Sequence, residues 1–363
     1  MGNIEPAPAN SELLGQVLTG VQMPRPAITG RVSATVSHAE RWQHFRCRIG
    51  AFRERYTVEP GLYALGSPDE NADVLASANY KLSFDALRRE LAGLDVWLLV
   101  LDTKGINVWC AAGKGTFGTE ELVRRIGKTG LHGAVRHRRL MLPQLGATGV
   151  SASEVRRRTG FRVSFGPVRA ADIPAYMRAG YRKTPEMSRV RFTLADRLVL
   201  TPMELNPALK KYPWFAAGAL VLFGLQRQGI MFAGALSGAL PFLLLGLVAV
   251  ASGAFVTPAL LPYIPFRSFA LKGLIAGVAL VLAASLIPSV STMEQSRLLM
   301  IVTFLLFPGA SSYLALQFTG STTFTGMSGV RKELRVAMPL YIGTAIASAL
   351  LLIAYKLTGW GLL

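Results

Sequence analysis

The chain has 363 residues, of which 51% are hydrophobic, with a formal net charge of +18 and two cysteines. Two cysteines exclude a disulfide framework and any four-cysteine zinc or iron–sulfur site. The basic charge comes without a zinc-finger or RNA-recognition signature, so we expect no nucleic-acid partner.

The apolar residues are unevenly distributed. Residues 212–363 hold 8 basic and 2 acidic side chains, against 31 and 19 in residues 1–211. We therefore expect a basic, cytoplasmic, water-soluble half followed by a membrane half. The prolines and missing periodicity of residues 1–35 predict an irregular N-terminal arm without a cleavable signal peptide.

A basic amphipathic segment is expected at Ala39–Arg55. Its apolar face is marked by spacings of three and four residues at Trp42, Phe45, Ile49 and Phe52. Cys47 lies off that face between two arginines. Two interpretations stay open for it: a reactive thiol of lowered pKa, or an incidental surface cysteine.

Residues 36–211 then alternate between strand-like and helix-like patterns. Strands are predicted at 62–65, 74–78, 96–101, 140–142 and 161–165, with helices at 84–94, 120–126, 151–158 and 170–178. Repeated strand–loop–helix units predict a mostly parallel, Rossmann-like α/β sheet with helices on both faces. Alternation over Val190, Phe192 and Leu194 predicts a closing strand or hairpin within Met187–Leu205.

The stretch Leu94–Gly118 contains an apolar strand, then a glycine-bearing loop, then a helical pattern that carries Cys110. Loops after parallel strands are where open α/β sheets bind ligands. Gly113-Lys114 does not complete a P-loop, because Val108 and Gly115 stand where that motif needs glycine and serine or threonine. Three interpretations of Cys110 stay open: a buried structural cysteine, a catalytic thiol with a histidine partner, or one axial ligand to a metal held in a macrocycle.

A transmembrane domain is predicted for residues 212–363. Its five apolar stretches run over about 213–226, 232–256, 269–290, 298–318 and 336–356. Alternating the loops across the membrane places seven basic residues on the side of the soluble half and three on the other. The positive-inside rule therefore predicts a multi-pass inner-membrane protein with its soluble domain in the cytoplasm.

The block Asn107–Lys114 (NVWCAAGK), preceded by LDTKGI, closely resembles the cap-helix motif of the mercury-methylating corrinoid proteins. These are membrane relatives of the corrinoid iron–sulfur protein large subunit. The resemblance extends to PQLGATGV (Pro143–Val150) and GFRVSFGPVRAADIP (Gly160–Pro174), and to the layout of a corrinoid domain before a membrane domain.

The resemblance implies a corrinoid bound base-off, with the Cys110 thiolate as axial cobalt ligand and a cap helix near 107–118. The cofactor-binding residues that it implies are Asn107, Val108, Trp109, Cys110, Ala111, Ala112, Gly113, Lys114, Gln144, Gly146 and Gly149. It implies that the small residues after Cys110 let a flat ring lie against the backbone.

The implied activity is that of a corrinoid-dependent methyltransferase that transfers a cobalt-bound methyl group to Hg(II), giving methylmercury. The implied partners are a small ferredoxin-like protein with two [4Fe–4S] clusters and a methyl-tetrahydrofolate-linked methyl donor. The alternative is a membrane-anchored corrinoid methyl carrier of one-carbon metabolism with a different acceptor.

Overall fold

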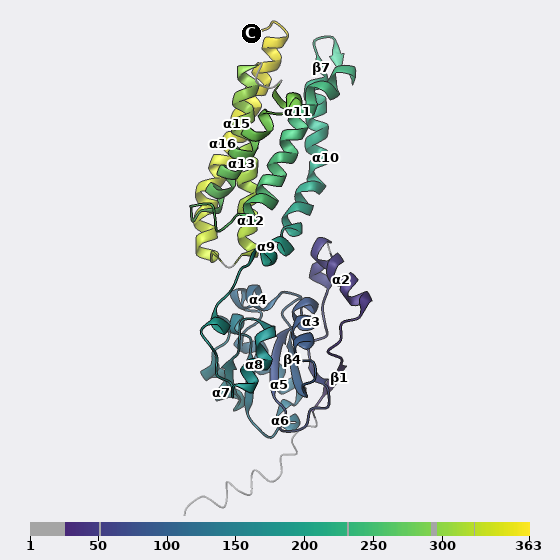
Figure 1. The fold of residues 1–363 in the computed structure, drawn as a ribbon, viewed down its shortest axis with the longest axis vertical. Coiled ribbons are helices and arrows are strands. Elements are labelled where there is room, and N and C mark those ends of the chain that lie inside the picture. The colour runs from purple at the N-terminus through teal and green to yellow at the C-terminus, as the bar shows by residue number, and fades with distance from the viewer. Residues whose placement is uncertain (1–25, 51, 231, 292–295, 323) are drawn as a thin grey trace, which may run out of the picture. The chain divides into compact units, whose positions relative to one another are not determined.

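The computed structural model describes residues 26–50, 52–230, 232–291, 296–322 and 324–363. The chain divides into two compact units, an α/β unit that ends at Arg189 and a helical unit that begins at Val190; residues 48–50 group with the helical unit. Figure 1 shows the helices and strands of each unit.

A six-stranded mixed sheet forms the centre of the α/β unit. Its order is β1-β2-β4-β3-β5-β6. The strands are β1 (Ile28–Val32), β2 (Leu62–Leu65), β3 (Val74–Ala78), β4 (Val96–Leu101), β5 (Arg139–Leu142) and β6 (Arg162–Phe165). Strands β4, β3, β5 and β6 are parallel, whereas β2 pairs antiparallel to β4.

Strand β4 is buried along its whole length, as its unbroken apolar run predicts. Trp97, Leu99 and Leu101 point into one apolar core, and Val96, Leu98 and Val100 point into the other. Helix α5 (Thr119–Thr129) packs on the first side, and α3 (Lys81–Glu90) and α8 (Ile173–Arg178) pack on the second. The sheet is therefore covered on both faces.

Three connections leave the carboxyl ends of neighbouring strands. The chain passes from β3 through α3 to β4 on one side, and then from β4 to β5 on the other side of β3. This second connection holds α4 (Val108–Lys114), α5 and α6 (Leu131–Ala134), and α7 (Ala152–Thr159) follows β5. Such a reversal opens a crevice at the carboxyl edge. Helix α4 lies at that end of the sheet and α6 at the opposite end (Figure 1).

The predicted N-terminal arm is only partly described, since residues 1–25 lie outside the described residues. Residues 26–35 are described, and the prediction was wrong for five of them, because Ile28–Val32 forms β1 beside β2. This strand is short and mostly exposed at the sheet edge, so it lacks the apolar periodicity that marks a strand in sequence.

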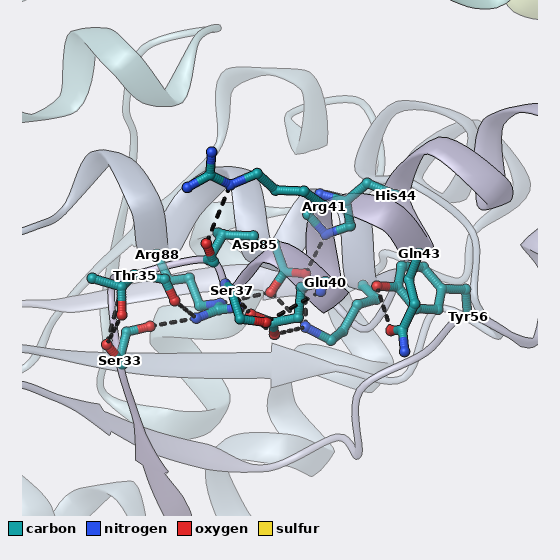
Figure 2. Close-up of polar contacts among 12 residues, drawn as sticks. Ser33, Thr35, Ser37, Glu40, Arg41, Gln43, His44, Tyr56, Asp85 and Arg88 are labelled. Carbon is teal, nitrogen blue, oxygen red and sulfur yellow. Dashed lines mark hydrogen bonds and ion pairs between the residues drawn. The ribbon is translucent and has the colours of Figure 1, made fainter.

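Helix α2 (His38–Ile49) is fastened to α3 by ion pairs (Figure 2). Oδ2 of the buried Asp85 carboxylate lies 2.7 Å from His44 Nε2 and 2.7 Å from Lys81 Nζ. Its Oδ1 lies 2.6 Å from Arg88 Nε. Glu40 pairs with the same two cations, at 2.9 Å from Lys81 and 2.6 Å from Arg88. The side chains of Glu40 and His44 on α2 therefore face the protein interior.

The cations hold Glu40 in its ionised form. Burial alone would raise the pKa of Glu40, but hydrogen bonds from Lys81, from the backbone of Ser37 and from Arg88 lower that pKa to about 2. A group with a depressed pKa stabilises the fold above its unfolded value of 4.5 and loses that contribution as the pH falls towards 2. The contribution of Glu40 to the anchoring of α2 is therefore fully present at neutral pH.

The helical unit consists mainly of long apolar helices that run beside one another (Figure 1). Its elements are α9 (Leu194–Leu200), α10 (Pro202–Gly224), the hairpin β7–β8 (Leu225–Gln226 and Gly229–Ile230), α11 (Phe232–Ala251), a π-helical turn (Ser252–Val256), α12 (Thr257–Ala259), α13 (Phe269–Ser285), α14 (Pro288–Ser291), α15 (Arg297–Gln317) and α16 (Met327–Gly359).

Among the described residues, three helices are long and apolar enough to cross a membrane: Gly234–Ala259, Arg297–Gly320 and Ser328–Gly359. Helix α13 is apolar but shorter, with 17 residues. Helix α10 coincides with the first predicted span, but its first half is polar and includes Lys210 and Lys211. The arrangement of five spans stays a prediction.

Small residues bring the helices of this unit into close contact. An added Cβ at Gly273 would lie 2.4 Å from the Cβ of Ala315, and one at Gly253 would lie 2.4 Å from the backbone oxygen of Ser311. The Ser311 hydroxyl lies 2.9 Å from that of Ser252 and 2.8 Å from the carbonyl oxygen of Gly273. Backbones therefore meet directly, as in membrane helix bundles.

The expected strand or hairpin within Met187–Leu205 is wrong. Residues 190–193 are irregular, and α9 follows them. The Thr193 side chain accepts from the Asp196 backbone N–H, and the Asp196 side chain accepts from that of Thr193, which is a capping box. The short alternation of apolar residues was outweighed by this helix start signal.

We expect Asp85→Ala to release α2, because it leaves the buried Arg88 and the half-buried Lys81 without their shared carboxylate. Removing one partner of a buried ion pair costs about 3–5 kcal/mol. Tryptic cleavage within α2 of the full chain should therefore accelerate at least about 100-fold when cleavage follows local opening. The control is Glu90→Ala, which removes an exposed pair with Arg89 and should change the rate little. An unchanged rate in Asp85→Ala would contradict the anchoring role.

Candidate functional site

The candidate site is built on the loops that follow β3 and β4. Asn79 directly follows β3 and is 5% exposed. Its Oδ1 accepts hydrogen bonds from the backbone N–H groups of Thr103 and Gly105, both at 3.0 Å. The Thr103 hydroxyl lies 2.8 Å from the same oxygen and 2.7 Å from the carbonyl oxygen of Ile106. One buried amide therefore fixes the loop that leads into α4.

This loop turns through two left-handed residues, Lys104 with φ 58° and Gly105 with φ 72°. A left-handed lysine is strained, and its position is held by hydrogen bonds from its backbone and its ammonium group to the Asp102 carboxylate. Burial would raise the pKa of Asp102, but these bonds from Lys104 lower it overall. The Asp102 N–H donates to Glu121 at 2.8 Å, which ties the loop to α5.

Asn107 is the N-cap of helix α4, and its side chain accepts a hydrogen bond from the Cys110 backbone N–H at 2.9 Å. It ends at Gly115, a left-handed residue with φ 80°. Helical spacing places Trp109, Cys110 and Gly113 on one side of this short helix. Trp109 and Cys110 are half-buried, and Gly113 is exposed. In the described part of the chain, no hydrogen bond engages the Cys110 thiol.

The small residues of α4 divide between its two sides. Ala111 and Ala112 are buried in the core beneath the helix. Gly113 faces open space, since an added Cβ there would have no atom within 4 Å. The side chains of Ala111 and Ala112 therefore cannot line a flat ring. Gly113 and the exposed Lys114 remain available on the outside.

The loop after β5 packs directly against α4 and the segment that follows it. A Cβ added at Gly149 would lie 2.2 Å from the Phe117 carbonyl oxygen and 3.1 Å from the Cα of Ala112. One added at Gly146 would lie 2.5 Å from the Phe117 ring. These glycines are therefore required for close packing. Gln144 is half-buried, and its Oε1 accepts a hydrogen bond from Lys183 Nζ at 2.6 Å.

The structure thus brings Asn107, Trp109, Cys110, Gly113 and the loop of Gly146 and Gly149 to one edge of the sheet. Sequence reasoning missed Asn79, which holds the loop before α4. The sequence does contain a signal for Asn79, because an amide side chain follows directly after the buried strand β3. A residue in that position is at the carboxyl edge by topology.

The thiol–histidine alternative for Cys110 finds no support in the described residues. His44 pairs with Asp85, His132 bonds the carbonyl oxygen of Thr159 and His137 bonds that of Ala72. The remaining histidine, His38, lies on α2 and is exposed. The described residues also contain no group of three or more His, Cys, Asp or Glu side chains placed to hold a metal ion.

The second cysteine differs sharply from the first. Cys47 is 1% exposed and packs with Tyr56 and Tyr80, its Sγ lying 3.8 Å from the Tyr80 hydroxyl. The prediction of a surface position for Cys47 was therefore wrong. Helix α2 turns Glu40 and His44 inward, and helical spacing places Cys47 on that same buried side.

A shallow depression of about 370 Å³ opens beside the carboxyl end of α4. It is lined by Asp102, Gly115, Thr116, Glu120, Glu121, Val123, Arg124 and Arg158. Cys110 is not part of this lining. The Cys110 residue is half-buried.

Residues 51–177 match the protein family described as the CO dehydrogenase/acetyl-CoA synthase delta subunit. Subunit gamma of the acetyl-CoA decarbonylase/synthase complex of Methanopyrus kandleri is 35% identical over 127 residues, 34% of this chain and 27% of that protein. The corrinoid/iron–sulfur protein large subunit of Moorella thermoacetica is 31% identical over 124 residues, again 34% of this chain and 27% of the relative.

Part of the α/β unit is therefore similar to a segment of a corrinoid/iron–sulfur protein subunit. The chain spans about a quarter of the length of these curated relatives. The matched segment contains α4, Cys110 and the loop of Gly146 and Gly149, and it ends before the helical unit. The candidate site therefore lies wholly within the related part.

We expect Gly149→Ala to destabilise the site, because the new methyl group meets a backbone oxygen and not a movable side chain. Such overpacking costs about 1–3 kcal/mol. Hydrogen exchange of the α4 amides should accelerate accordingly. The matched control is Gly127→Ala in α5, where open space surrounds an exposed helical glycine and alanine should stabilise by about 0.5–1 kcal/mol. Equal exchange rates in α4 of wild type and Gly149→Ala would refute the packing role.

The two cysteines should react at different rates with a thiol reagent in the full chain. Cys110 is half-exposed and should react rapidly with a thiol reagent, whereas the buried Cys47 should react only on unfolding. Mass spectrometry should find one fast equivalent in the wild type and none in Cys110→Ser. Rapid labelling of Cys47 would show that the α2 packing described above is wrong.

Proposed function

We propose that this chain is a membrane-anchored, corrinoid-dependent methyltransferase with the Cys110 thiolate as axial ligand to the corrinoid cobalt, and that its methyl acceptor is Hg(II). The observation that carries this proposal is the placement of Cys110. Its half-exposed thiol stands at the carboxyl edge of the sheet, within a segment related to corrinoid proteins. Asn107 and the loop held by Asn79 fix its position.

The residues around Cys110 fit a corrinoid. The thiol has no hydrogen-bond partner in the described residues and so is available as a ligand. Gly113 leaves open space on the same side of α4, where a planar ring needs close approach to the backbone. The described residues offer no cluster for a bare metal ion, so one thiol requires a metal already held by a macrocycle.

When bound, the corrinoid supplies a cobalt centre that carries a methyl group and passes it to an electron-poor acceptor. Cys110 would donate electron density as a thiolate, a soft and strong donor. Asn107 would keep the Cys110 backbone in place. Trp109 would offer an apolar surface to the ring, and Lys114 a cation to an amide oxygen or phosphate of its periphery. Gln144 borders the same edge through the loop packed on α4.

Membrane placement is part of the proposal. The apolar helices Gly234–Ala259, Arg297–Gly320 and Ser328–Gly359 would cross the inner membrane. The loops between the predicted spans carry more basic residues on the membrane side of the α/β unit than on the other side, which supports a cytoplasmic α/β unit. The reductant would be a small ferredoxin-like protein with two [4Fe–4S] clusters, and the methyl donor would be linked to methyl-tetrahydrofolate. The basic charge of the soluble half suits an acidic electron donor.

A second candidate is a membrane-anchored corrinoid methyl carrier of one-carbon metabolism with another acceptor. The Methanopyrus kandleri relative favours it, since that protein is named as a subunit of an acetyl-CoA decarbonylase/synthase complex. The site would be the same in both cases. The candidates differ only in the molecule that receives the methyl group.

The axial ligand is tested by the anaerobic absorption spectrum of the full chain reconstituted with a corrinoid. We expect a bound corrinoid whose bands shift in Cys110→Ala and shift differently in Cys110→His, because the donor atom changes. Cys47→Ala removes the other thiol and should leave the bands in place. Absorption bands that are the same in wild type and in both Cys110 variants would overturn the ligand assignment, and so would a wild-type chain that binds no corrinoid.

The acceptor is tested with the chain loaded with a methylated corrinoid. Hg(II) should be methylated faster than by the same free corrinoid at equal concentration, and Cys110→Ala should lose this advantage. A rate equal to that of the free corrinoid would reject mercury as the acceptor. The carrier function would then be the better account of a chain that still binds the cofactor.

A further inference from the structure

Helix α2 exposes the apolar side that an ordinary amphipathic helix buries. Its apolar residues point away from the α/β unit: Trp42 is 60% exposed, Phe45 53% and Ile49 37%. The rings of Trp42 and Phe45 stack at a centroid distance of 5.5 Å, so they form a continuous aromatic surface. Globular helices normally bury such a stripe in the core.

Ion pairs fix which side of α2 faces the α/β unit. The inward side of α2 carries Glu40 and His44, which reach the buried Asp85 and its cations (Figure 2). Turning Trp42 and Phe45 inward would break these ion pairs and leave Asp85 without its histidine partner. The outward position of the aromatic stripe is therefore a fixed property of the fold.

The borders of the stripe are cationic. Helical spacing places Arg41 and Arg48 along one side of it and Arg46 along the other, and all three are exposed. Glu40, the single acidic residue of α2, is turned inward and paired. The outer surface of α2 thus combines exposed aromatic rings with positive charge and has no carboxylate of its own.

We infer that this face of α2 docks on the anionic surface of a phospholipid bilayer, with Trp42 and Phe45 in the headgroup region. This combination is typical of helices that lie in a membrane interface: an apolar stripe with tryptophan or phenylalanine, bordered by arginine or lysine. Anionic lipids attract each such cation. The inference rests on the proposed membrane anchor, which would hold the same chain at a bilayer.

A protein partner fits this surface less well. The aromatic side chains are exposed on a single helix, whereas protein hot spots usually fill pockets ringed by contacts. A bilayer needs no shape complementarity. It accepts tryptophan at the interface and pairs arginine with lipid phosphate.

The test uses the full chain in nanodiscs that contain brominated lipid, which quenches tryptophan at close range. The chain has five tryptophans, so the signal of Trp42 is obtained as the difference between wild type and Trp42→Phe, which keeps the stripe apolar. In nanodiscs with phosphatidylglycerol we expect the Trp42 emission to be quenched and shifted to the blue. In phosphatidylcholine alone the quenching should largely disappear.

Charge is tested by substitution. Arg41→Gln should lower the ratio of docked to undocked Trp42 about fivefold, since one arginine near an anionic surface contributes about 1 kcal/mol. The matched control is Arg156→Gln, an exposed arginine on α7, which should leave the ratio unchanged. An equal effect of the two substitutions would show that net charge alone, and not the α2 face, decides docking.

Three other results would overturn the inference. Trp42 that stays unquenched in anionic nanodiscs, while the chain co-elutes with them, would reject docking and leave the membrane anchor standing. A chain that does not co-elute with any nanodisc would reject the proposed membrane anchor itself. Quenching of Trp42 only on adding an acidic iron–sulfur protein would assign the stripe to a protein partner.

Discussion

The site depends on one buried amide. Asn79 follows β3, and β3 is the strand that lies between β4 and β5, so its carboxyl end borders the loops on both sides. Because its oxygen accepts from two backbone N–H groups of the loop after β4, that loop has one conformation and α4 starts at one residue. The position of Cys110 follows from that start. A hydrogen-bond acceptor buried in a core is costly unless it is used, and here it is used fully.

Much of this edge could be predicted from the sequence. The run of Val96–Leu101 predicts a strand buried on both faces, and the structure confirms it. The strands predicted at 62–65 and 74–78 are also confirmed, and α4 at Val108–Lys114 lies where the family resemblance implied a cap helix near 107–118. The strands have a strong local signal in their apolar runs. The antiparallel pairing of β2 with β4 was not predictable, because strand direction is decided by tertiary contacts and leaves no local trace.

Helix α2 shows why a periodic pattern can mislead. The spacing of Trp42, Phe45 and Ile49 correctly predicts a helix, but it says nothing of which side faces the core. That choice is made by Asp85, more than 40 positions away from Glu40 in sequence, together with its two cations. Long-range ion pairs of this kind have no signature in a hydropathy pattern. The burial of Cys47 follows from the same reversal.

The helical unit is held together by a different principle from the α/β unit. Gly253, Gly273 and Ser311 allow backbones to touch, and in the proposed membrane placement the bilayer would offer little hydrophobic driving force between apolar helices. The consequence concerns tolerance to sequence change. Large residues on the outside of the bundle can be exchanged for one another as long as they stay apolar. A single added methylene at one of the small contact positions would push two helices apart. These few small residues therefore restrict how the helices pack more strongly than the large apolar residues do.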